Sequence, residues 1–313
     1  MKRVLALAGG GLLALALLLA LVGYGTMHGW NLTRVPAAQV SALLRPWDEV
    51  VTPEGPGPFP TVIGFHGCGG KRAAQGEWAR WFREAGFASV IVDSFAGRGL
   101  DAAAVCGGRR LLPMERAGDV LVSLADVRRL PFVDPARIVL AGWSHGSVAI
   151  MDLLVMDPPR EIPPNLERES GETGGARGLE GVAGVVLFYP YCGIGSRSWT
   201  GTWAWRAPIL FLLAGADRVV SPDACLEAAG ALEAAGQRVE TRLYPGADHA
   251  FDQNDHPPGS PLRFDPVATA DARERLRAFL AKLARPGAAR AQAAAPAGSG
   301  PQPRPGGHRG VLG

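Results

Sequence analysis

The chain has 313 residues, of which 47% are hydrophobic and 19% charged, and its formal net charge is +3. A chain of this size and apolar content can form one α/β domain with a full core, or at most two small domains. The positive charge is small, scattered and partly located in the C-terminal tail, so we expect no nucleic-acid partner.

The first residues have the pattern of an export signal. Lys2 and Arg3 precede an uncharged, leucine-rich stretch from Val4 to Val22. This pattern is typical of a secretory signal peptide or an uncleaved signal anchor, and a stretch of this length is near the lower limit for crossing a bilayer. Cleavage and membrane attachment through residues 4–22 both stay open, and a buried core helix is a third reading. We therefore expect a signal peptide or anchor over residues 1–25. The domain would then be periplasmic or secreted, either released or held at the inner membrane.

The cysteines fit an exported protein. Their number is even, which permits disulfides in an oxidising compartment. Three pairings are possible and the sequence does not choose among them, while free buried thiols are the alternative. None of the four has the spacing of a metal site, so we expect no metal. These residues are Cys68, Cys106, Cys192 and Cys225.

The composition changes twice along the chain. Residues 26–57 are rich in proline and are predicted to be a linker and edge segment, with a short helix over 37–44 and an edge strand over 49–52. Residues 58–285 are predicted to form the catalytic domain. Residues 286–313 contain mainly Ala, Gly, Pro, Gln and Arg without periodicity, which predicts a disordered tail.

Apolar strands alternate with helices inside the predicted domain. Near-continuous apolar strands that alternate with helices indicate an α/β fold, in which a mostly parallel sheet is covered by helices on both faces. The predicted strands cover 61–65, 87–93, 137–141, 182–189, 208–213 and 239–244. The predicted helices cover 78–85, 114–130, 147–156, 222–235 and 265–284.

The most informative motif is Gly142-Trp143-Ser144-His145-Gly146, which lies between a predicted strand and a predicted helix. Strand, G-x-S-x-G and helix make up the nucleophile elbow of α/β-hydrolases. The glycines allow a very tight turn that raises the serine hydroxyl out of the sheet. The following helix directs unpaired backbone N–H groups toward an oxyanion. Ser144 is therefore the candidate nucleophile, and the backbone N–H of His145 is a candidate oxyanion donor.

A serine nucleophile needs a base, and the base needs an acid that orients it. Asp217 and His249 follow the last two predicted strands, in the chain order Ser, Asp, His that this fold uses. Because parallel strands end at one edge of the sheet, we expect the three side chains to meet there. Asp248 and Asp252 are rival acids, although an acid beside the histidine in sequence rarely reaches its ring.

A glycine-rich loop, His66-Gly67-Cys68-Gly69-Gly70, follows the first strand of the predicted domain. Glycines let backbone N–H groups approach a substrate oxygen without obstruction. We assign the second oxyanion donor to the N–H of Cys68, with Gly67 and Gly69 as neighbouring alternatives. The loop lacks the G-x-G-x-x-G spacing of a dinucleotide site, and we expect no cofactor.

Taken together, these motifs resemble the dienelactone hydrolase family of α/β-hydrolases over about residues 58–284. The resemblance implies a Ser or Cys nucleophile with Asp and His, which acts on small esters or lactones without metal or cofactor. Dienelactone hydrolases in the narrow sense have a cysteine where this chain has Ser144, which favours ordinary carboxylic esters, and the apolar leader also departs from the cytoplasmic members. The resemblance rests on residues 66–70, Asp93-Ser94-Phe95 with Arg98-Gly99, residues 142–146, Gly215-Ala216-Asp217 and Asp248-His249-Ala250-Phe251.

The sequence thus predicts a serine hydrolase that cleaves small carboxylic esters or lactones through an acyl-enzyme. A serine peptidase of the prolyl-oligopeptidase branch and a non-catalytic envelope protein that binds a ligand with the same fold are the alternatives. Substrate choice is expected to lie in the loops 94–113, 158–181 and 193–207. In the last loop, Trp199, Trp203 and Trp205 either line a pocket or pack in the core. Oligomeric state is left open.

Overall fold

The computed structural model describes residues 2–27, 29–156, 158, 161–168, 178–200 and 203–283, and the side chains of residues 2–13, 27 and 200 lie outside that description. Its centre is a seven-stranded sheet with the strand order β1-β3-β2-β4-β5-β6-β7. β1 is antiparallel to β3, and every other neighbouring pair is parallel. The strands are β1 (Glu49–Val51), β2 (Phe59–Phe65), β3 (Ala88–Val92), β4 (Val133–Trp143), β5 (Val182–Phe188), β6 (Ile209–Ala214) and β7 (Val239–Tyr244).

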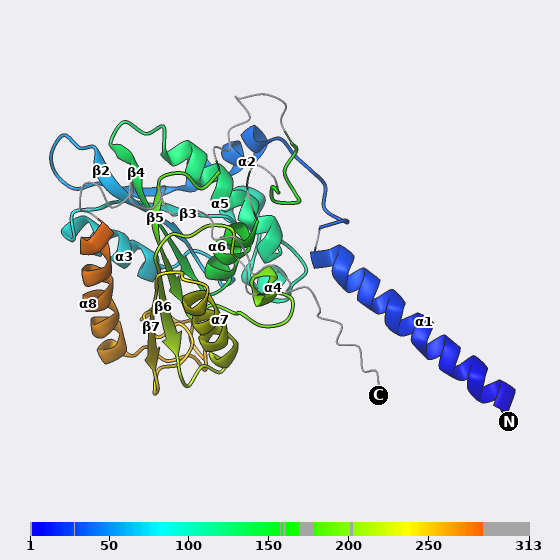
Figure 1. Ribbon diagram of the computed structural model, residues 1–313. Helices are drawn as coiled ribbons and strands as arrows, with labels where there is room; N and C mark the ends of the chain where they lie inside the picture. Colours follow the sequence, from blue (N-terminus) through cyan, green and yellow to red (C-terminus); the bar gives the residue numbers. More distant parts are fainter. Residues whose placement is uncertain are drawn as a thin grey trace, which may run out of the picture.

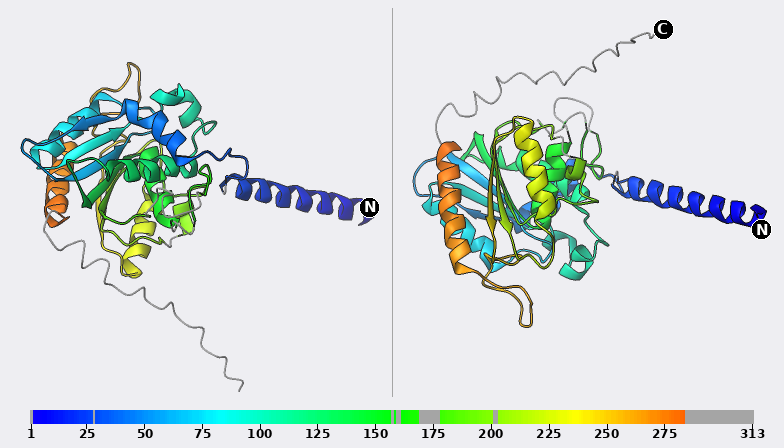
Figure 2. Two further views of the ribbon diagram at one scale, coloured as in Figure 1. Left: turned by 90° about the horizontal axis from the view of Figure 1, so that it is seen from above. Right: turned by 60° about the horizontal axis from the view of Figure 1, so that its bottom comes forward.

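Helices cover both faces of this sheet (Figure 1). One face packs against α2 (Ala37–Leu44), α5 (Pro113–Val127), α6 (His145–Val155) and α7 (Asp223–Ala234). The other face packs against α3 (Ala73–Glu84) and α8 (Pro266–Leu283). In the right-hand view of Figure 2, α8 (orange) and α7 (yellow) lie on opposite sides of the strands. The predicted α/β fold with a mostly parallel sheet is confirmed.

The central strands have apolar side chains on both faces, which is why they read as continuous apolar runs. In β4, Ile138 and Leu140 belong to the core under α5 and α6, whereas Val139 and Ala141 belong to the core under α3 and α8. All four are at most 1% exposed. Complete burial of each large aliphatic side chain stabilises the fold by about 1.5–3 kcal/mol, so both layers contribute to holding the strand ends in place.

The predicted strands and helices occur in the structure, but several of them begin or end at other residues than expected. The edge strand β1 and the helix α2 occur where expected. β4 begins at Val133, ahead of the predicted start at 137, because its irregular first part pairs with β2 across a register shift. The helix α4 (Ala102–Cys106) was not predicted. The glycines around it indicate a loop, but Asp101 accepts the backbone N–H of Ala104 at 2.7 Å and starts a single helical turn.

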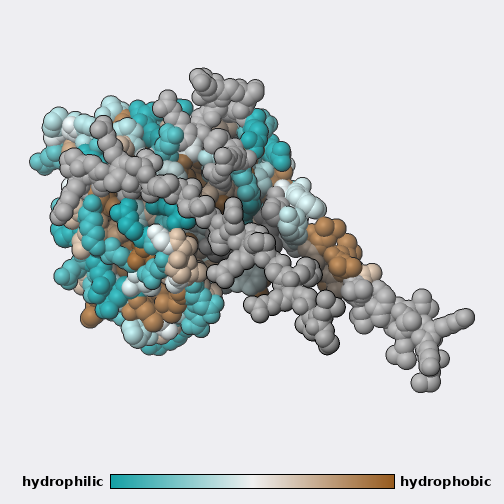
Figure 3. Space-filling model, in the orientation of Figure 1, coloured by the Kyte–Doolittle hydropathy of each residue, from teal (hydrophilic) through white to brown (hydrophobic). Residues whose placement is uncertain are grey.

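The N-terminal helix α1 (Lys2–Met27) projects away from the sheet and its helices (Figures 1 and 2). Several apolar side chains along it are exposed, including Leu17 and Leu19 at 63% and 62%. Figure 3 shows a brown, hydrophobic patch on this arm. A search of the described residues finds no helix with the length and hydropathy of a membrane span. The signal or anchor over residues 1–25 stays a prediction, and the predicted disordered tail at 286–313 lies outside the described residues.

Candidate active site

Ser144 occupies the sharp turn between β4 and α6. Its backbone has φ of 51°, in the left-handed region that non-glycine residues rarely adopt, and its N–H donates to the Phe188 carbonyl at 2.9 Å. The flanking glycines are required by close packing. A Cβ on Gly142 would lie 2.5 Å from the Ser147 nitrogen, and one on Gly146 would lie 2.0 Å from the Phe65 oxygen. The elbow therefore has the strained geometry that the sequence predicts.

The structure brings the three predicted side chains together. Ser144 Oγ lies 2.9 Å from Nε2 of His249, and Nδ1 of the same ring lies 2.7 Å from Asp217 Oδ2. The loops after β6 and β7 supply Asp217 and His249, at the edge where β4 delivers Ser144. The distances fit a neutral imidazole whose Nδ1–H donates to Asp217 and whose Nε2 accepts the Ser144 hydroxyl proton.

Asp217 is held in a single orientation. Its Oδ1 accepts the backbone N–H groups of Val219 and Val220 at 2.8 and 2.9 Å, which leaves Oδ2 facing the imidazole. The two rival acids have other partners. Asp248 accepts backbone N–H groups of Arg218 and His249, and Asp252 accepts donors from three aromatic side chains. Asp217 is thus the acid that the geometry selects.

The loop His66–Gly70 lies directly against the elbow. A Cβ on Gly67 would be 3.5 Å from the Ser144 Cβ. The Gly67 carbonyl accepts both Nδ1–H of His66 at 2.7 Å and the N–H of Gly70 at 3.2 Å. Because a trans peptide directs its C=O and N–H to opposite sides, anchoring this carbonyl orients the Cys68 N–H away from it. His66 itself accepts the Ser94 N–H at Nε2, which fixes its neutral tautomer.

Behind the two predicted oxyanion donors lies Arg116, a fully buried residue of α5. Its Nη1 donates to the His66 carbonyl at 2.7 Å and to Nδ1 of His145 at 3.2 Å, and its Nε donates to Ser94 Oγ at 3.0 Å. Burial lowers the pKa of Arg116 to about 10, so the guanidinium stays charged at neutral pH. One cation therefore links the loop that contains Cys68 to the helix that begins at His145.

The same environment keeps both histidines neutral. Burial, followed by the Arg116 charge, lowers the pKa of His66 to about 4 and that of His145 well below its usual value. A histidine with a depressed folded pKa contributes stability above its unfolded pKa of about 6.5, and that stability is lost as pH falls toward the folded value. The window for His66 is therefore from about pH 6.5 to about pH 4.

We expect His66→Asn to have a flatter stability profile than the unmodified chain in that window. The amide can still donate to the Gly67 carbonyl but takes up no proton. The free energy of unfolding of the unmodified chain should fall relative to the variant by up to about 3 kcal/mol between pH 6.5 and 4. Chemical denaturation at four or five pH values checks this, and parallel curves for the two proteins would contradict the neutral, buried state of His66.

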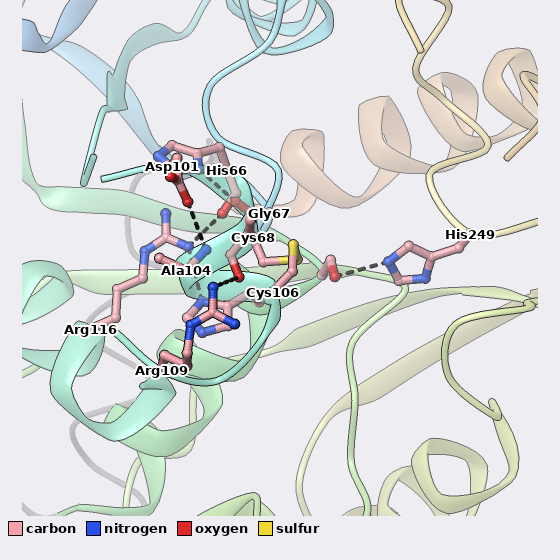
Figure 4. Close-up of a disulfide and its surroundings, with 12 residues drawn as sticks. His66, Gly67, Cys68, Asp101, Ala104, Cys106, Arg109, Arg116 and His249 are labelled. Carbon is pink, nitrogen blue, oxygen red and sulfur yellow. Dashed lines mark hydrogen bonds between the residues drawn. A yellow bond between two sulfur atoms is a disulfide. The ribbon is translucent and has the colours of Figure 1, made fainter. Parts of the chain in front are cut away.

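Two disulfides settle the pairing that the sequence left open. Cys68 is bonded to Cys106 and Cys192 to Cys225, which excludes the free-thiol alternative. The first bond ties the glycine-rich loop to α4, as Figure 4 shows, with the His249 ring to one side of it and Arg116 to the other. The second ties the segment after β5 to α7. The Cys68 backbone is thus restrained by a covalent bond as well as by the His66 hydrogen bond.

The two disulfides make a matched experiment, because they close chain segments of 38 and 33 residues. Loss of either bond should cost a similar stability, about 2–4 kcal/mol. We expect kcat for ester hydrolysis to be about 10-fold lower in Cys68→Ser/Cys106→Ser than in Cys192→Ser/Cys225→Ser. Complete loss of an oxyanion donor lowers kcat by about 10²–10³-fold, and a displaced donor should cost less than that. Kinetics well below both melting temperatures test this. Equal kcat values in the two double variants would contradict a role of the first bond at the site.

The tryptophans of the loop 193–207 have different positions. Trp203 is 7% exposed within the core under α5 and α6, and Trp205 packs against the same core. Trp199 is 56% exposed. Trp203 is therefore a core residue and the partly buried Trp205 packs beside it, which leaves Trp199 as the surface candidate in that loop. Within the predicted loop 158–181, residues 159–160 and 169–177 lie outside the described residues.

Sequence reasoning missed the supporting residues of this site. Arg116 lies between Glu115 and Asp119 in the first turns of α5, a charged stretch that is typical of an exposed helix face, so its complete burial had no signal in the sequence. The partner of Cys68 and the partners of Asp252 are distant in sequence and carried no local signal. In the described residues, no group of three or more His, Cys, Asp or Glu side chains is arranged to hold a metal ion.

Comparison with known proteins agrees with the fold. Residues 173–284 match the model of the dienelactone hydrolase family, a segment that contains Asp217 and His249 and begins after Ser144. Esterase 2 of Thermogutta terrifontis is similar in structure. Its butyrate-bound form is 19% identical and its paraoxon-phosphorylated form is 20% identical, each with a TM-score of 0.58 over 75% of this chain and 88% of that one. The form phosphonylated by cyclosarin is 21% identical with a TM-score of 0.56 over the same shares. A search of curated protein sequences finds no match.

Proposed function

We propose that this protein is a serine hydrolase of small carboxylic esters or lactones. The α/β-hydrolase fold and the match of residues 173–284 to the dienelactone hydrolase family support this proposal. One observation carries the proposal: Ser144, His249 and Asp217 form a continuous hydrogen-bonded chain with separations of 2.9 and 2.7 Å. The glycine-rich loop against the elbow adds a place for the substrate oxygen. A fold kept only for binding needs neither feature, which favours an enzyme over the envelope-binding alternative.

The residues have these roles in the proposed reaction. Ser144 Oγ attacks the ester carbonyl carbon while His249 Nε2 takes the hydroxyl proton. Asp217 holds the Nδ1–H and stabilises the imidazolium that forms. The backbone N–H groups of Cys68 and His145 donate to the tetrahedral oxyanion. The C–O bond to the leaving alcohol then breaks, and the alcohol takes the proton from Nε2.

Deacylation repeats these steps with water. His249 removes a proton from water, the hydroxide attacks the acyl carbon, and the tetrahedral oxyanion forms again at the same two N–H groups. Collapse releases the carboxylic acid, and the proton on Nε2 returns to Ser144 Oγ. Each step of deacylation uses the same side chains and backbone groups as acylation. The reaction needs no metal or cofactor as proposed.

The comparisons support small acyl groups and a reactive serine as parts of this proposal. The similar Thermogutta esterase was solved with butyrate bound and in forms phosphorylated by paraoxon or phosphonylated by cyclosarin. We accordingly expect hydrolysis of p-nitrophenyl esters graded from acetate to octanoate, with highest kcat/KM for short acyl chains. Absence of hydrolysis across this series, and across simple lactones, would refute the proposed function.

We also propose that the domain works outside the cytoplasm, either released or attached through residues 4–22. Two disulfides in one chain are typical of oxidising compartments, and the basic and apolar leader is typical of export. A fusion to a reporter that folds only in the periplasm tests this proposal. Active reporter is the expected result, and an inactive reporter with stable fusion protein would contradict it.

A further inference from the structure

A buried carboxylate joins the segments that carry Ser144 and His249. Asp252 is 4% exposed, and its Oδ2 accepts Nε1–H of Trp78 at 2.7 Å and Nε1–H of Trp143 at 2.9 Å. Its Oδ1 accepts the Tyr189 hydroxyl at 2.7 Å. Trp143 immediately precedes the elbow serine, and Asp252 lies three residues after the triad histidine. One side chain therefore bridges β4, the end of β5 and the histidine loop.

Tyr189 contacts both Asp252 and the imidazole of His249. Its ring packs on the His249 ring with centroids 4.7 Å apart and an interplanar angle of 59°. The residue lies just after β5 with φ of 37°, a conformation that is costly for a bulky side chain. Its N–H donates to the Leu212 carbonyl at 2.8 Å, and Gln253 Nε2 donates to its hydroxyl at 3.1 Å. Both ends of Tyr189 are thus anchored.

Packing alone does not require a carboxylate at position 252. The three donors that contact it are neutral side chains, and burying a carboxylate costs several kcal/mol that hydrogen bonds must offset. A cluster in which this carboxylate and its three donors were all apolar would fill the same space at lower cost. The arrangement instead fixes three aromatic side chains in direction as well as in distance. Such directional control is useful where a nearby group must be held within a fraction of an ångström.

The imidazole is such a group. The hydrogen bond between Nδ1 and Asp217 holds one edge of the ring but leaves tilting of the ring plane open. The rigid Tyr189 ring in contact with the imidazole restricts that tilt and keeps Nε2 in line with Ser144 Oγ. A displacement of about 1 Å at a reacting group can cost about 10²-fold in rate.

We propose that Asp252 and Tyr189 are positioning residues for the acyl-transfer steps. Asp252 fixes the Tyr189 hydroxyl, so that the Tyr189 ring supports the His249 imidazole, and it fixes Trp143 beside the elbow. This inference rests on the proposed serine hydrolase function. It assigns no contact between these two residues and the substrate.

The main test is Tyr189→Phe, which keeps the ring and removes the bond to Asp252. Tyr244→Phe is the matched control, because both tyrosines pack on Phe251, at 5.6 and 5.0 Å between centroids, while of the two only the Tyr189 hydroxyl donates to Asp252. With p-nitrophenyl acetate, we expect Tyr189→Phe to lower kcat about 10-fold at unchanged KM, and Tyr244→Phe to leave kcat within about 2-fold. Unchanged kcat in Tyr189→Phe would overturn the proposal.

A second variant, Asp252→Asn, tests the coupling. The side-chain oxygen of the asparagine can still accept the two indole N–H groups. Its NH₂ group then stands where the oxygen that accepts the Tyr189 hydroxyl was, and NH₂ cannot accept that proton. Both single variants break the same bond, so the loss in the double variant should be smaller than the product of the single losses. Losses that multiply would show independent effects and overturn the proposal.

A spectroscopic measurement separates this inference from the proposed function. The Nδ1 proton shared by His249 and Asp217 is expected at low field in the proton NMR spectrum. It should shift or broaden in Tyr189→Phe and stay unchanged in Tyr244→Phe, whether or not a good substrate is known. An unmodified protein that hydrolyses no ester would refute the proposed function alone. An unmoved resonance in Tyr189→Phe would refute the positioning role.

Discussion

Ser144→Ala is expected to lower kcat for a short-chain p-nitrophenyl ester by about 10⁶-fold while leaving the fold intact. The hydroxyl is the atom that attacks the ester, and in the structure its Oγ lies 2.9 Å from the base that would remove its proton. Alanine meets the same backbone strain at φ of 51° as serine does, so the elbow itself should be preserved. Steady-state kinetics and circular dichroism of the purified variant check both parts.

Ser147→Ala is the matched control for this variant. Ser147 lies one turn further along α6, and its buried hydroxyl donates to the Phe188 carbonyl at 3.1 Å. Loss of this hydroxyl should lower the free energy of unfolding by about 1 kcal/mol and leave kcat nearly unchanged. Ester hydrolysis that survives in Ser144→Ala, or that disappears equally in both variants, would contradict the assignment of the nucleophile.

Asp217→Asn is the second large effect, with an expected loss of about 10⁴-fold in kcat. The backbone N–H groups of Val219 and Val220 point at one carboxylate oxygen, so the asparagine oxygen should stay there and its NH₂ should face His249 Nδ1. The ring would then carry its proton on Nε2 and could not accept one from Ser144. Kinetics of the variant against the unmodified chain measure the loss.

Asp248→Asn distinguishes the true acid from its neighbour. Asp248 accepts the backbone N–H of Arg218 and of His249, and its carboxylate pairs with the Arg218 guanidinium at 3.3 Å. Since it supports the loop and does not contact the imidazole, its substitution should cost less than about 10-fold. A larger loss in Asp248→Asn than in Asp217→Asn would reverse the roles given to the two acids.

The fold was predictable because strands that are buried on both faces appear in the sequence as continuous apolar runs. Strands such as β5 and β6 are buried at every position, and helices such as α5 and α8 have an apolar side that faces the sheet. The triad was predictable for a related reason. Parallel strands present their carboxyl ends at one edge, so Ser144, Asp217 and His249 had to meet once their strands were identified.

The supporting structure could not be predicted in the same way. The bond between Cys68 and Cys106 depends on α4, whose single turn is shorter than any periodic signal. The contact of Asp252 with Trp78 and Trp143 joins positions 174 and 109 residues apart, and no local pattern marks such pairs. From the sequence, Asp252 is a rival acid for His249, whereas in the structure its carboxylate accepts hydrogen bonds from three aromatic side chains.

The proposed function depends on acylation of the Ser144 hydroxyl during catalysis. The most direct measurement is to inactivate the ester-hydrolysing protein with paraoxon and locate the adduct by peptide mass spectrometry. We predict one phosphoryl group per chain on the peptide that contains Ser144, with its appearance matching the loss of activity. Complete inactivation with the adduct on another residue, or full activity with Ser144 modified, would show that Ser144 is not the nucleophile.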